Sequence, residues 1–416
     1  MTSEDFETRH VKDVVSFAKG KPPAEQPYFG KDAELYLTPE YLRGGAFSEP
    51  IKANKNAVRV SGGETIVLWD GSNAGEVFRA RPGVLSSTMV HLKPENSFDD
   101  DYFFYAMKGW EGYLKGQTSG SGIPHVDKEV LGKLALLRYP INEQVKIAKI
   151  LATVDQAIEQ TEALIAKQQR IKTGLMQDLL TRGIDEHGQL RTEQTHAFKD
   201  SPLGRIPVEW GVQTLESVSE FVTSGSRGWA QYYTTEGALF LRIGNLTRKH
   251  INMRFDDVIR VSPPASSEGE RTAVKKDDLL ISITADLGVV AVIPDGFETA
   301  YVNQHIALTR LDRTQAYARF VGWFFNGQLG QAQFDKLNES GAKAGLNLPS
   351  IKNLHIPVPP LDEQVKIAQA IDAANEKTDE FHARLVKCQS LKRALMQDLL
   401  TGRKRVVDLL HAEVAA

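Results

Sequence analysis

Cysteine is nearly absent from this chain of 416 residues, since Cys388 is the single one. A lone cysteine excludes an internal disulfide and any zinc site built on several cysteines, and it suits a reducing compartment. Long hydrophobic runs are absent as well, because no stretch approaches the ~20 apolar residues that a membrane-spanning helix needs. The opening residues, Met1–Asp5, are polar and acidic, unlike a secretory signal. We therefore expect a cytoplasmic protein without a membrane segment.

An excess of positive charge is also missing. Lysine and arginine together number 50, against 53 aspartate and glutamate residues, which gives a net charge of −3. A uniformly basic chain would indicate nucleic-acid binding. Any such function here must therefore come from local geometry.

Motifs for catalysis are not found in the sequence. It has no Asn-Pro-Pro-(Tyr/Phe) motif of amino-methyltransferases and no Gly-x-x-x-x-Gly-Lys-(Ser/Thr) loop for a nucleotide. Pro294-Asp295 is followed by glycine and is interpreted as a turn, not as a nuclease motif. The ten histidines, among them His250, His305 and His355, lack ligand spacing. We expect neither a metal site nor catalysis in this chain.

The chain contains an internal repeat. Glu143–Ala148 is identical to Glu363–Ala368, and Leu175–Thr181 is identical to Leu395–Thr401, both at an offset of 220 residues. Looser matches extend the repeat over almost the whole chain; they join Val11, Val14 and Phe17 to Leu215, Val218 and Phe221, Glu64–Asp70 to Asp278–Thr284, Val84–Leu92 to Tyr301–Thr309, and the loop 119–122 to 340–345. A repeat of this length predicts two similar halves.

Each repeat ends in a long amphipathic segment. Apolar residues recur four and three positions apart over 141–183 and again over 361–405, each time after a proline and a capping residue. About 40 residues at ~1.5 Å each give helices about 60 Å long. One apolar stripe needs a partner, and each helix can serve the other. The middles exchange large for small residues, as at Val154 and Ala374, which suits two helices packed on each other through their middles. We expect the pair to be an antiparallel coiled coil, which would give the molecule a pseudo-twofold axis.

The remaining sequence predicts two globular halves, residues 1–140 and 201–360, with a polar linker at 184–200 and a tail at 406–416. Thr65–Trp69 and Val84–Leu92 read as strands, Tyr102–Leu114 as a core-facing helix, and Val11, Val14 and Phe17 have helical spacing. The predicted fold class is α+β, with two mixed α/β domains in a pseudo-twofold arrangement joined by two long helices.

The identical helix ends predict a docking site that occurs twice, for two copies of one partner. A recent duplication that left the ends alike, without any shared partner, is the alternative interpretation. The candidate docking side chains are Gln144, Ile147, Leu175, Met176 and Leu179 in the first copy, and Gln364, Ile367, Leu395, Met396 and Leu399 in the second.

These segments resemble a known family. The pattern Pro-(Ile/Leu)-(Asn/Asp)-Glu-Gln…Ile-Ala, closing with Leu-Met-Gln-Asp-Leu-Leu-Thr, at 140–182 and 360–402 looks like the two conserved helices of type I restriction-modification specificity subunits. Leu203–Trp210 resembles the Gly-x-Ile-Pro-x-x-Trp entry to their target recognition domains, and Ser224–Tyr233 with Phe240–Leu246 is similar to the opening of such domains. The first half lacks this entry and starts near Val11.

The resemblance implies a non-catalytic DNA-reading subunit. Each target recognition domain would bind one half of a split, asymmetric target in double-stranded DNA, and the helices would fix the gap between the halves. Two methyltransferase subunits would dock on the helices, and restriction subunits would join them. S-adenosylmethionine and ATP would then belong to the partner subunits, with no cofactor on this chain.

Candidate DNA contacts are polar or aromatic residues in glycine-rich loops and beside strands, because base edges and phosphates favour such side chains. In the second half they are Ser226, Arg227, Trp229, Gln231, Tyr232, Arg242, Asn245, Asn303, Gln304 and Lys343. In the first half, Lys19, Lys21, Arg43, Arg79 and Arg81 are candidates by charge, and Ser119 and Ser121 belong to a Ser-Gly loop. Structural roles are open alternatives, with Trp229 in the core, Arg242 and Asn245 in a strand and turn, and Asn303 at a sheet edge.

Two other functions stay open. A coiled-coil adaptor would bind proteins instead of DNA, and residues 201–350 favour it mildly, since 15 Lys and Arg there face 16 Asp and Glu. The specificity part of a fused restriction-methylation enzyme would need a cofactor motif, which the chain lacks. Binding that weakens steeply as salt rises would distinguish a DNA reader from the adaptor.

Overall fold

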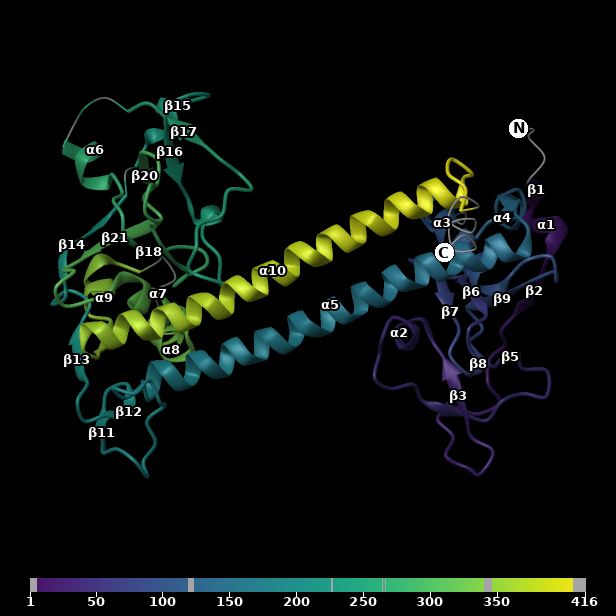
Figure 1. Ribbon diagram of the computed structural model, residues 1–416, viewed down its shortest axis with the longest axis horizontal. Coiled ribbons are helices and arrows are strands. Elements are labelled where there is room, and N and C mark those ends of the chain that lie inside the picture. Colours follow the sequence, from purple (N-terminus) through teal and green to yellow (C-terminus); the bar gives the residue numbers. More distant parts are fainter. Residues whose placement is uncertain are drawn as a thin grey trace, which may run out of the picture. The chain divides into compact units, whose positions relative to one another are not determined.

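The computed structural model describes residues 6–118, 123–225, 227–263, 265, 267–339 and 346–406. The chain divides into two compact units, called unit 1 (Met1–Glu162 with Ala383–Ala416) and unit 2 (Ala163–His382). Both long helices are present, as α5 at Ile141–Thr181 and α10 at Leu361–Leu400 (Figure 1). Each unit combines one globular half with one part of each helix, whereas the sequence predicted the helices as separate segments.

Unit 1 is built on two four-stranded sheets. The first has the strand order β2-β9-β6-β7 and is antiparallel, and α3 packs against β6 and β7. The second has the order β4-β3-β8-β5, in which β3 and β8 run parallel. The elements are β1 Glu7–His10, α1 Val11–Val14, β2 Val15–Lys19, β3 Glu34–Leu37, α2 Pro39–Leu42, β4 Pro50–Ile51, β5 Arg59–Val60, β6 Thr65–Leu68, β7 Val77–Arg79, β8 Gly83–Leu85, β9 Met89–Pro94, α3 Asp100–Gly116, α4 Lys128–Gly132 and β10 Ala135–Arg138.

Unit 2 repeats the order of the first sheet and the parallel pair of the second, but its short strand β15 pairs with β17, at the edge opposite to the one that β5 occupies in unit 1. Its sheets have the orders β14-β21-β18-β19 and β15-β17-β16-β20, again with one parallel pair, β16 and β20. A two-stranded ribbon, β13 with β22, corresponds to β1 with β10. The elements are β11 Phe198–Ser201, β12 Gly204–Pro207, β13 Gly211–Thr214, β14 Ser219–Ser224, η1 Trp229–Tyr232, β15 Tyr233–Thr234, β16 Ala238–Leu241, η2 Ile243–Asn245, β17 Arg260–Val261, α6 Ser267–Thr272, β18 Leu279–Ser282, β19 Val290–Val292, β20 Ala300–Val302, β21 Ile306–Leu311, α7 Ala318–Asn326, α8 Gln328–Glu339, α9 Leu348–Lys352 and β22 His355–Val358.

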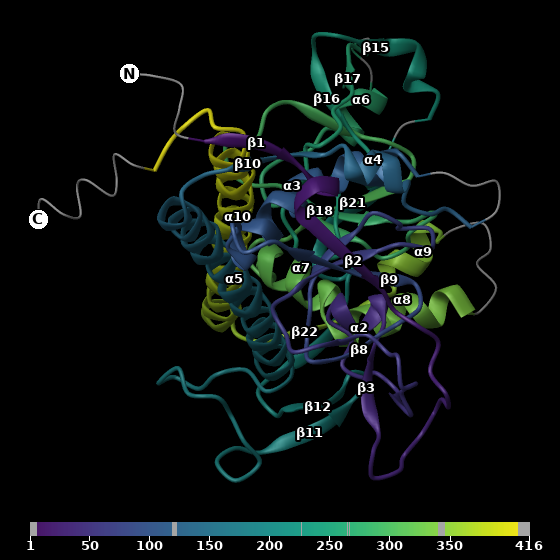
Figure 2. The ribbon, with the colours of Figure 1, turned by 90° about the vertical axis from the view of Figure 1, so that its right-hand side faces the viewer.

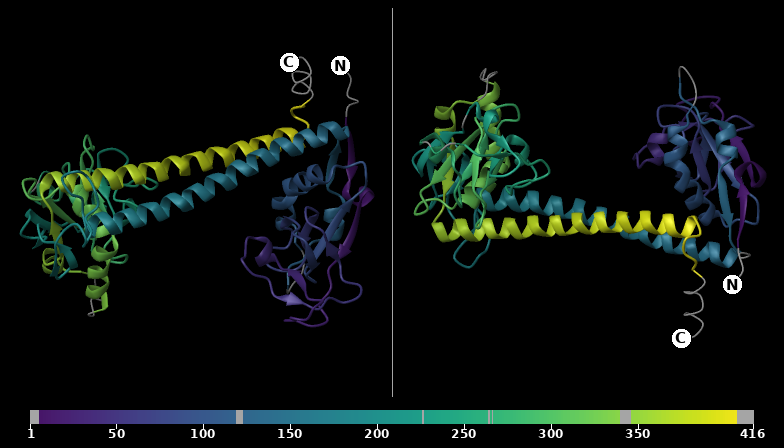
Figure 3. Two further views of the ribbon diagram at one scale, coloured as in Figure 1. Left: turned by 60° about the horizontal axis from the view of Figure 1, so that its bottom comes forward. Right: turned by 90° about the horizontal axis from the view of Figure 1, so that it is seen from above.

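The long helices pair in opposite directions within each unit (Figure 3). In unit 1, Lys392 of α10 reaches Asp155 of α5 at 2.5 Å, and the chain just after α10 reaches Glu143 at the start of α5. In unit 2, Lys172 of α5 lies 3.0 Å from Asn375 of α10, and the chain just after α5 reaches the start of α10. The predicted antiparallel coiled coil is therefore confirmed. No helix in the described ranges is long and apolar enough to span a bilayer.

The structure corrects three local predictions. The helical spacing near Val11 gives one short turn, α1, because Phe17 already lies in β2 and pairs with β9. Val84–Leu92 is two strands in different sheets, since residues 86–88 turn between β8 and β9. The polar segment 184–200 is not a free linker, because Arg191 is buried in it and β11 pairs with β12 in a ribbon of its own (Figure 2).

Candidate nucleic-acid interface

The same junction of strand ends occurs in both units, where the two sheets of a unit meet. Backbone hydrogen bonds tie the residue after one strand to the turn between two others. In unit 1 these bonds run from Gly20 to Met89, from Ser86 to Leu37, and from Trp69 and Asp70 to Thr88. In unit 2 they run from Gly225 to Ile306, from Asn303 to Leu241, and from Ile283 to His305. The repeat has therefore kept one backbone frame.

Gly20 and Gly225 hold this frame together because a side chain does not fit at either position. A Cβ on Gly20 would lie 2.0 Å from the carbonyl oxygen of Ser86. A Cβ on Gly225 would lie 2.1 Å from the carbonyl oxygens of Val302 and Asn303. Both glycines let one strand end pass directly against a neighbouring turn, so the junction is a rigid platform for the side chains around it.

The side chains on the shared frame differ between the units. The turn after β8 carries Ser86, Ser87 and Thr88, whereas the turn after β20 carries Asn303, Gln304 and His305. In unit 2 the imidazole of His305 lies 2.8 Å from the Thr284 hydroxyl and 3.2 Å from the Gln304 amide. One frame with two sets of polar groups suits recognition of two unlike surfaces.

Unit 1 has a hollow of about 370 Å³ beside this junction. Three loops line it, namely the segment from β3 into α2, the turn between β6 and β7, and the turn between β8 and β9. The lining residues are Tyr36, Thr38, Pro39, Glu40, Arg43, Leu68, Asp70, Gly71, Ser72, Asn73, Ser86, Ser87 and Thr88. Hydroxyl, amide, carboxylate and guanidinium groups thus face one space, which offers both donors and acceptors.

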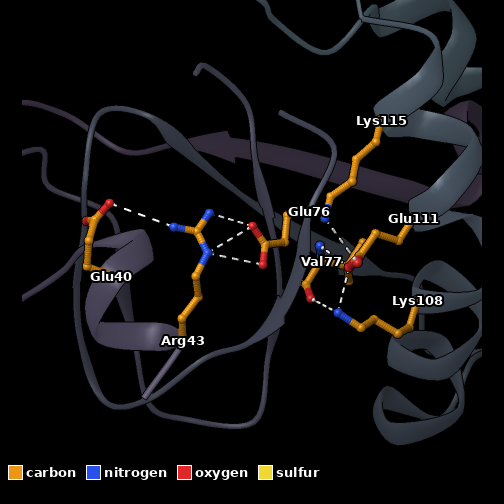
Figure 4. Close-up of polar contacts among 7 residues, drawn as sticks. All are labelled: Glu40, Arg43, Glu76, Val77, Lys108, Glu111 and Lys115. Atoms are coloured by element: carbon orange, nitrogen blue, oxygen red, sulfur yellow. Dashed lines mark hydrogen bonds and ion pairs between the residues drawn. The ribbon is translucent and has the colours of Figure 1, made fainter. Parts of the chain in front are cut away.

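Arg43 is the hollow's arginine, and a chain of polar contacts holds it in place (Figure 4). Glu76 accepts from its Nε at 3.1 Å and from its Nη2 at 2.5 Å. The next residue, Val77, is bound through its backbone by Glu111 and Lys108 of α3. The hydrogen bond to Glu76 raises the pKa of Arg43, so the guanidinium stays charged. The helix thereby fixes the strand, and the strand fixes the arginine.

Several predicted contacts in unit 2 have structural roles instead. Trp229 is 4% exposed and stacks on Phe240, so it belongs to a small core. Asn245 is 4% exposed, and its amide bonds the backbone at Arg242, Arg254 and Asp257. Asn303 is buried and accepts from the amide of His305. These three side chains are buried in internal contacts, which is the structural role that the sequence left open for each of them.

The other predicted contacts of unit 2 are accessible. Arg227 and Gln231 are exposed, while Tyr232 and Gln304 are half-buried. Arg242 is paired with Asp257 at 2.5 Å, so its charge is already balanced. Ser226 and Lys343 lie outside the described residues.

The predicted cations of unit 1 mostly have partners. Lys19 pairs with Asp70 of the hollow at 2.7 Å. Arg79 pairs with Asp101 and lies 4.3 Å from the centre of the Phe104 ring, and Arg81 lies 4.5 Å from that of Tyr41. Lys21 is exposed. Ser119 and Ser121 lie outside the described residues. Sequence reasoning missed the hollow, since its lining loops are distant in sequence and show no shared motif.

The repeated Glu-Gln pair has a structural explanation. Gln144 donates to the carbonyls of Ser97 and Tyr139 and accepts from Asp99, and Gln364 makes the same three bonds with Gln315, Pro359 and Tyr317. Glu143 is bound by Arg405, and Glu363 by Arg191. Each pair therefore fastens the start of one long helix to its globular half and to the segment just beyond the other helix.

The predicted docking side chains are covered by their own units. Seven are less than 10% exposed, namely Gln144, Ile147, Met176, Leu179, Gln364, Ile367 and Leu399. Leu175, Leu395 and Met396 are partly buried and pack against the same cores. Identity of the helix ends thus matches the same internal packing in both units, and seven of the ten predicted docking side chains are buried in that packing.

Both halves of the chain match the sequence model of one known protein family. The sequence model of the type I restriction modification DNA specificity domain matches residues 3–168 and again residues 207–387. The chain belongs to the type I restriction-modification DNA specificity family. The two matches cover the two halves of the repeat, so the strands and helices that units 1 and 2 share are the fold of that specificity domain occurring twice.

Relatives of the whole chain support this membership. The MjaVIII specificity subunit of Methanocaldococcus jannaschii is 30% identical over 417 residues, covering 98% of this chain and 94% of that protein. The EcoBI specificity subunit of Escherichia coli is 20% identical over 349 residues, covering 81% and 72%. The crystal structure of the S subunit from M. genitalium shares the fold, with a TM-score of 0.63, 16% identity and coverage of 96% and 97%.

Proposed function

We propose that this chain is the DNA-sequence specificity subunit of a type I restriction-modification complex, in which each globular half binds one half of a bipartite double-stranded DNA target. The duplicated strand-end junction carries this proposal. A shared backbone frame supplies the same approach to DNA twice, while unlike side chains on it read unlike half-sites. The target would accordingly be asymmetric.

The long helices would set the gap between the half-sites. α5 has 41 residues and α10 has 40, and hydrogen bonds at each helix start fasten it to a globular half. A continuous helix is stiff, so a spacer of this kind fixes half-site separation as the dimer axis does in symmetric DNA-binding proteins.

Catalysis would belong to other subunits. The groups at the junctions and helix ends are binding and structural ones, and the proposed partners are two methyltransferase subunits and restriction subunits. The methyltransferase would extrude the target base, because chemistry on a base does not occur inside the stack. S-adenosylmethionine and ATP would be bound by these partners, in keeping with the absence of their motifs from this sequence.

Partner docking would use the outward faces of the helices. Ile171 of α5 and Leu391 of α10 occupy corresponding repeat positions and are 47% and 51% exposed. Ile141 and Leu361 also correspond and are 47% and 38% exposed. Each long helix thus carries a matched pair of exposed apolar side chains, so that two copies of one partner would find equivalent surfaces. The buried residues of the helix ends do not provide such surfaces.

The adaptor and fused-enzyme alternatives are not favoured. Family membership covers both halves of the chain, and relatives of similar length are specificity subunits. The near-neutral charge is compatible with DNA reading, because recognition groups are presented locally at the junctions.

The decisive experiment maps methylated bases in the genome of cells with and without this gene. The expected result is a bipartite motif with two unlike halves that disappears when the gene is deleted. Binding of the assembled complex to that motif should weaken steeply with salt, since several phosphate contacts release counterions. An unchanged methylation pattern, or binding that is flat with salt, overturns the proposal.

A further inference from the structure

The hollow of unit 1 contains an arginine with an open hydrogen-bonding edge. Glu76 occupies the Nε and Nη2 side of the Arg43 guanidinium. The nearest carboxylate to Nη1 is that of Glu40, at 3.8 Å, which is too long for a hydrogen bond. Within the part of the chain that the structure describes, the Nη1–Nη2 edge therefore keeps N–H groups for an outside acceptor.

This edge is preorganised. The ring of Phe78 lies 5.8 Å from the guanidinium carbon, and the Glu76 side chain is only 16% exposed. A guanidinium held on one edge by a carboxylate presents its other edge in a fixed direction, so little side-chain entropy is lost when an acceptor pair binds. The Arg43 side chain itself is 35% exposed, so a ligand in the hollow can reach it.

The composition of the hollow argues against a phosphate. Glu40 and Asp70 also line it, and Glu76 lies directly behind Arg43. A phosphate offers only acceptors and carries negative charge, so these carboxylates would repel it. A base pair in the major groove offers donors and acceptors together, which matches a lining of arginine, asparagine, hydroxyls and carboxylates.

We propose that Arg43 reads a guanine in the half-site bound by unit 1, with its Nη1–Nη2 edge donating to guanine O6 and N7 and with Glu76 as the positioning residue. Two adjacent acceptors on one base edge are the partner that an arginine fork fits best. The assignment rests on the proposed function, and it names the base at one position of the target.

In unit 2, the arginine that follows the matching strand, Arg248, has its guanidinium nitrogens already hydrogen-bonded within the unit. Arg248 follows β16 much as Arg43 follows β3, but its Nε and Nη2 bond Asp286 and its Nη1 bonds Gln331. Its Nη2 also reaches the carbonyl of Leu287. All three nitrogens of Arg248 are thus engaged inside unit 2, so the guanine-reading arrangement is particular to unit 1.

The test maps genomic methylation in cells whose only copy of the gene encodes Arg43→Ala, Arg43→Lys or a control. We expect both variants to relax one guanine position of a single half-site while the other positions stay unchanged. Lysine keeps the charge but not the fork that Glu76 holds, so it should restore the position only in part, whereas alanine should not restore it at all. The control is Arg59→Ala, since Arg59 makes a two-bond pair with Glu34 but does not line the hollow; it should leave the motif intact.

A second measurement keeps the assignment falsifiable at the level of one atom. Duplexes carrying 7-deazaguanine at the assigned position lack the N7 acceptor, and the full-length chain assembled with its methyltransferase should bind them about 5- to 150-fold more weakly. The Arg43→Ala complex, which has no donor at this position, should show no such loss. Any of three outcomes overturns the assignment. These are a methylation motif that the variants leave unchanged, methylation that the variants lower equally at every site of an unchanged motif, and a 7-deazaguanine substitution that weakens binding equally with and without the Arg43 side chain. If the unaltered gene produces no bipartite motif, the proposed function itself fails instead.

Discussion

The ammonium nitrogen of Lys172 lies 3.0 Å from the amide oxygen of Asn375. At the corresponding repeat positions, unit 1 places Lys392 2.5 Å from Asp155. An aromatic ring flanks each lysine, 5.7 Å away for Trp323 and 5.9 Å for Tyr105. The same contact between the long helices is therefore an ion pair in unit 1, whereas in unit 2 a charged lysine donates to a neutral amide. Lys172 is only 3% exposed.

This difference predicts a pH dependence of stability. Burial lowers the pKa of Lys172 from its ordinary 10.5, against the opposing attraction of Asp379. The folded chain then holds this proton less tightly than the unfolded chain, so the contribution of Lys172 to stability improves as pH rises toward 10.5. Relative to Lys172→Met, the wild type should gain unfolding free energy as the pH rises through the alkaline range toward the ordinary lysine pKa of 10.5. Urea unfolding at several pH values measures this.

Two comparisons make that result specific to Lys172. The nearby His250 has a lowered pKa because of burial, so it is neutral throughout this range and adds no slope. Asp155→Asn copies the arrangement of unit 2 into unit 1 and should cost about 1 kcal/mol by loss of a partly buried ion pair. If the difference in unfolding free energy between wild type and Lys172→Met stays constant with pH, the pKa of Lys172 is not the cause of the pH dependence.

The buried pair of Arg191 and Glu363 should dominate the attachment of α10 within unit 2. Their side chains are 9% and 7% exposed, and Glu363 also accepts from Ile184 and Trp210. Arg191→Met leaves a carboxylate buried without its cation and should lower the unfolding free energy by about 3–5 kcal/mol. Arg205→Met is the control, because its exposed pair with Glu193 should contribute less than about 1 kcal/mol. An equal loss of unfolding free energy in Arg191→Met and Arg205→Met, measured by chemical denaturation, would contradict this prediction.

The junction glycines should tolerate no side chain. Gly20→Ala or Gly225→Ala forces a methyl group against backbone carbonyls, so each should lower the unfolding free energy of its unit by about 1–3 kcal/mol, as overpacking of a core does. Gly112→Ala is the matched control, since that glycine of α3 has open space around it and should gain up to about 1 kcal/mol in helix propensity. Thermal unfolding of the three variants tests this, and a neutral Gly20→Ala would refute the close approach.

Docking of the methyltransferase should depend on the exposed helix faces. Ile171→Asp combined with Leu391→Asp should reduce co-purification of the methyltransferase at least tenfold, roughly the loss of one hot-spot contact, because each removes exposed apolar surface from one proposed copy of the site. The change should leave thermal unfolding of the isolated chain nearly unaltered. Lys167→Asp with Lys387→Asp, at exposed matched positions on the same helices, controls for added negative charge. Full co-purification of the first variant means that the partner binds elsewhere.

The helix ends show where reasoning from the sequence misleads. Identity of Gln144 with Gln364 favours a shared partner, yet each amide makes three bonds inside its own unit. A repeated sequence indicates a repeated environment, and it does not reveal whether that environment is a core or a surface. Exposed residues such as Ile171 and Leu391 differ between the copies, so sequence identity does not single them out.

By itself the sequence determined the duplication and the two long helices, because apolar periodicity and exact repeats are local signals that need no tertiary information. The antiparallel direction of the helix pair was a prediction that the contacts between the helices confirmed. It also identified the family, through residues that fasten the helices. Only the tertiary structure decided which polar residues are accessible. Trp229, Asn245 and Asn303 became interior groups, while Arg43 and Glu76, 33 positions apart, met beside the hollow. The physical reason is that a binding surface is assembled from loops whose proximity depends on strand order. Strand order cannot be inferred from the sequence of any single loop.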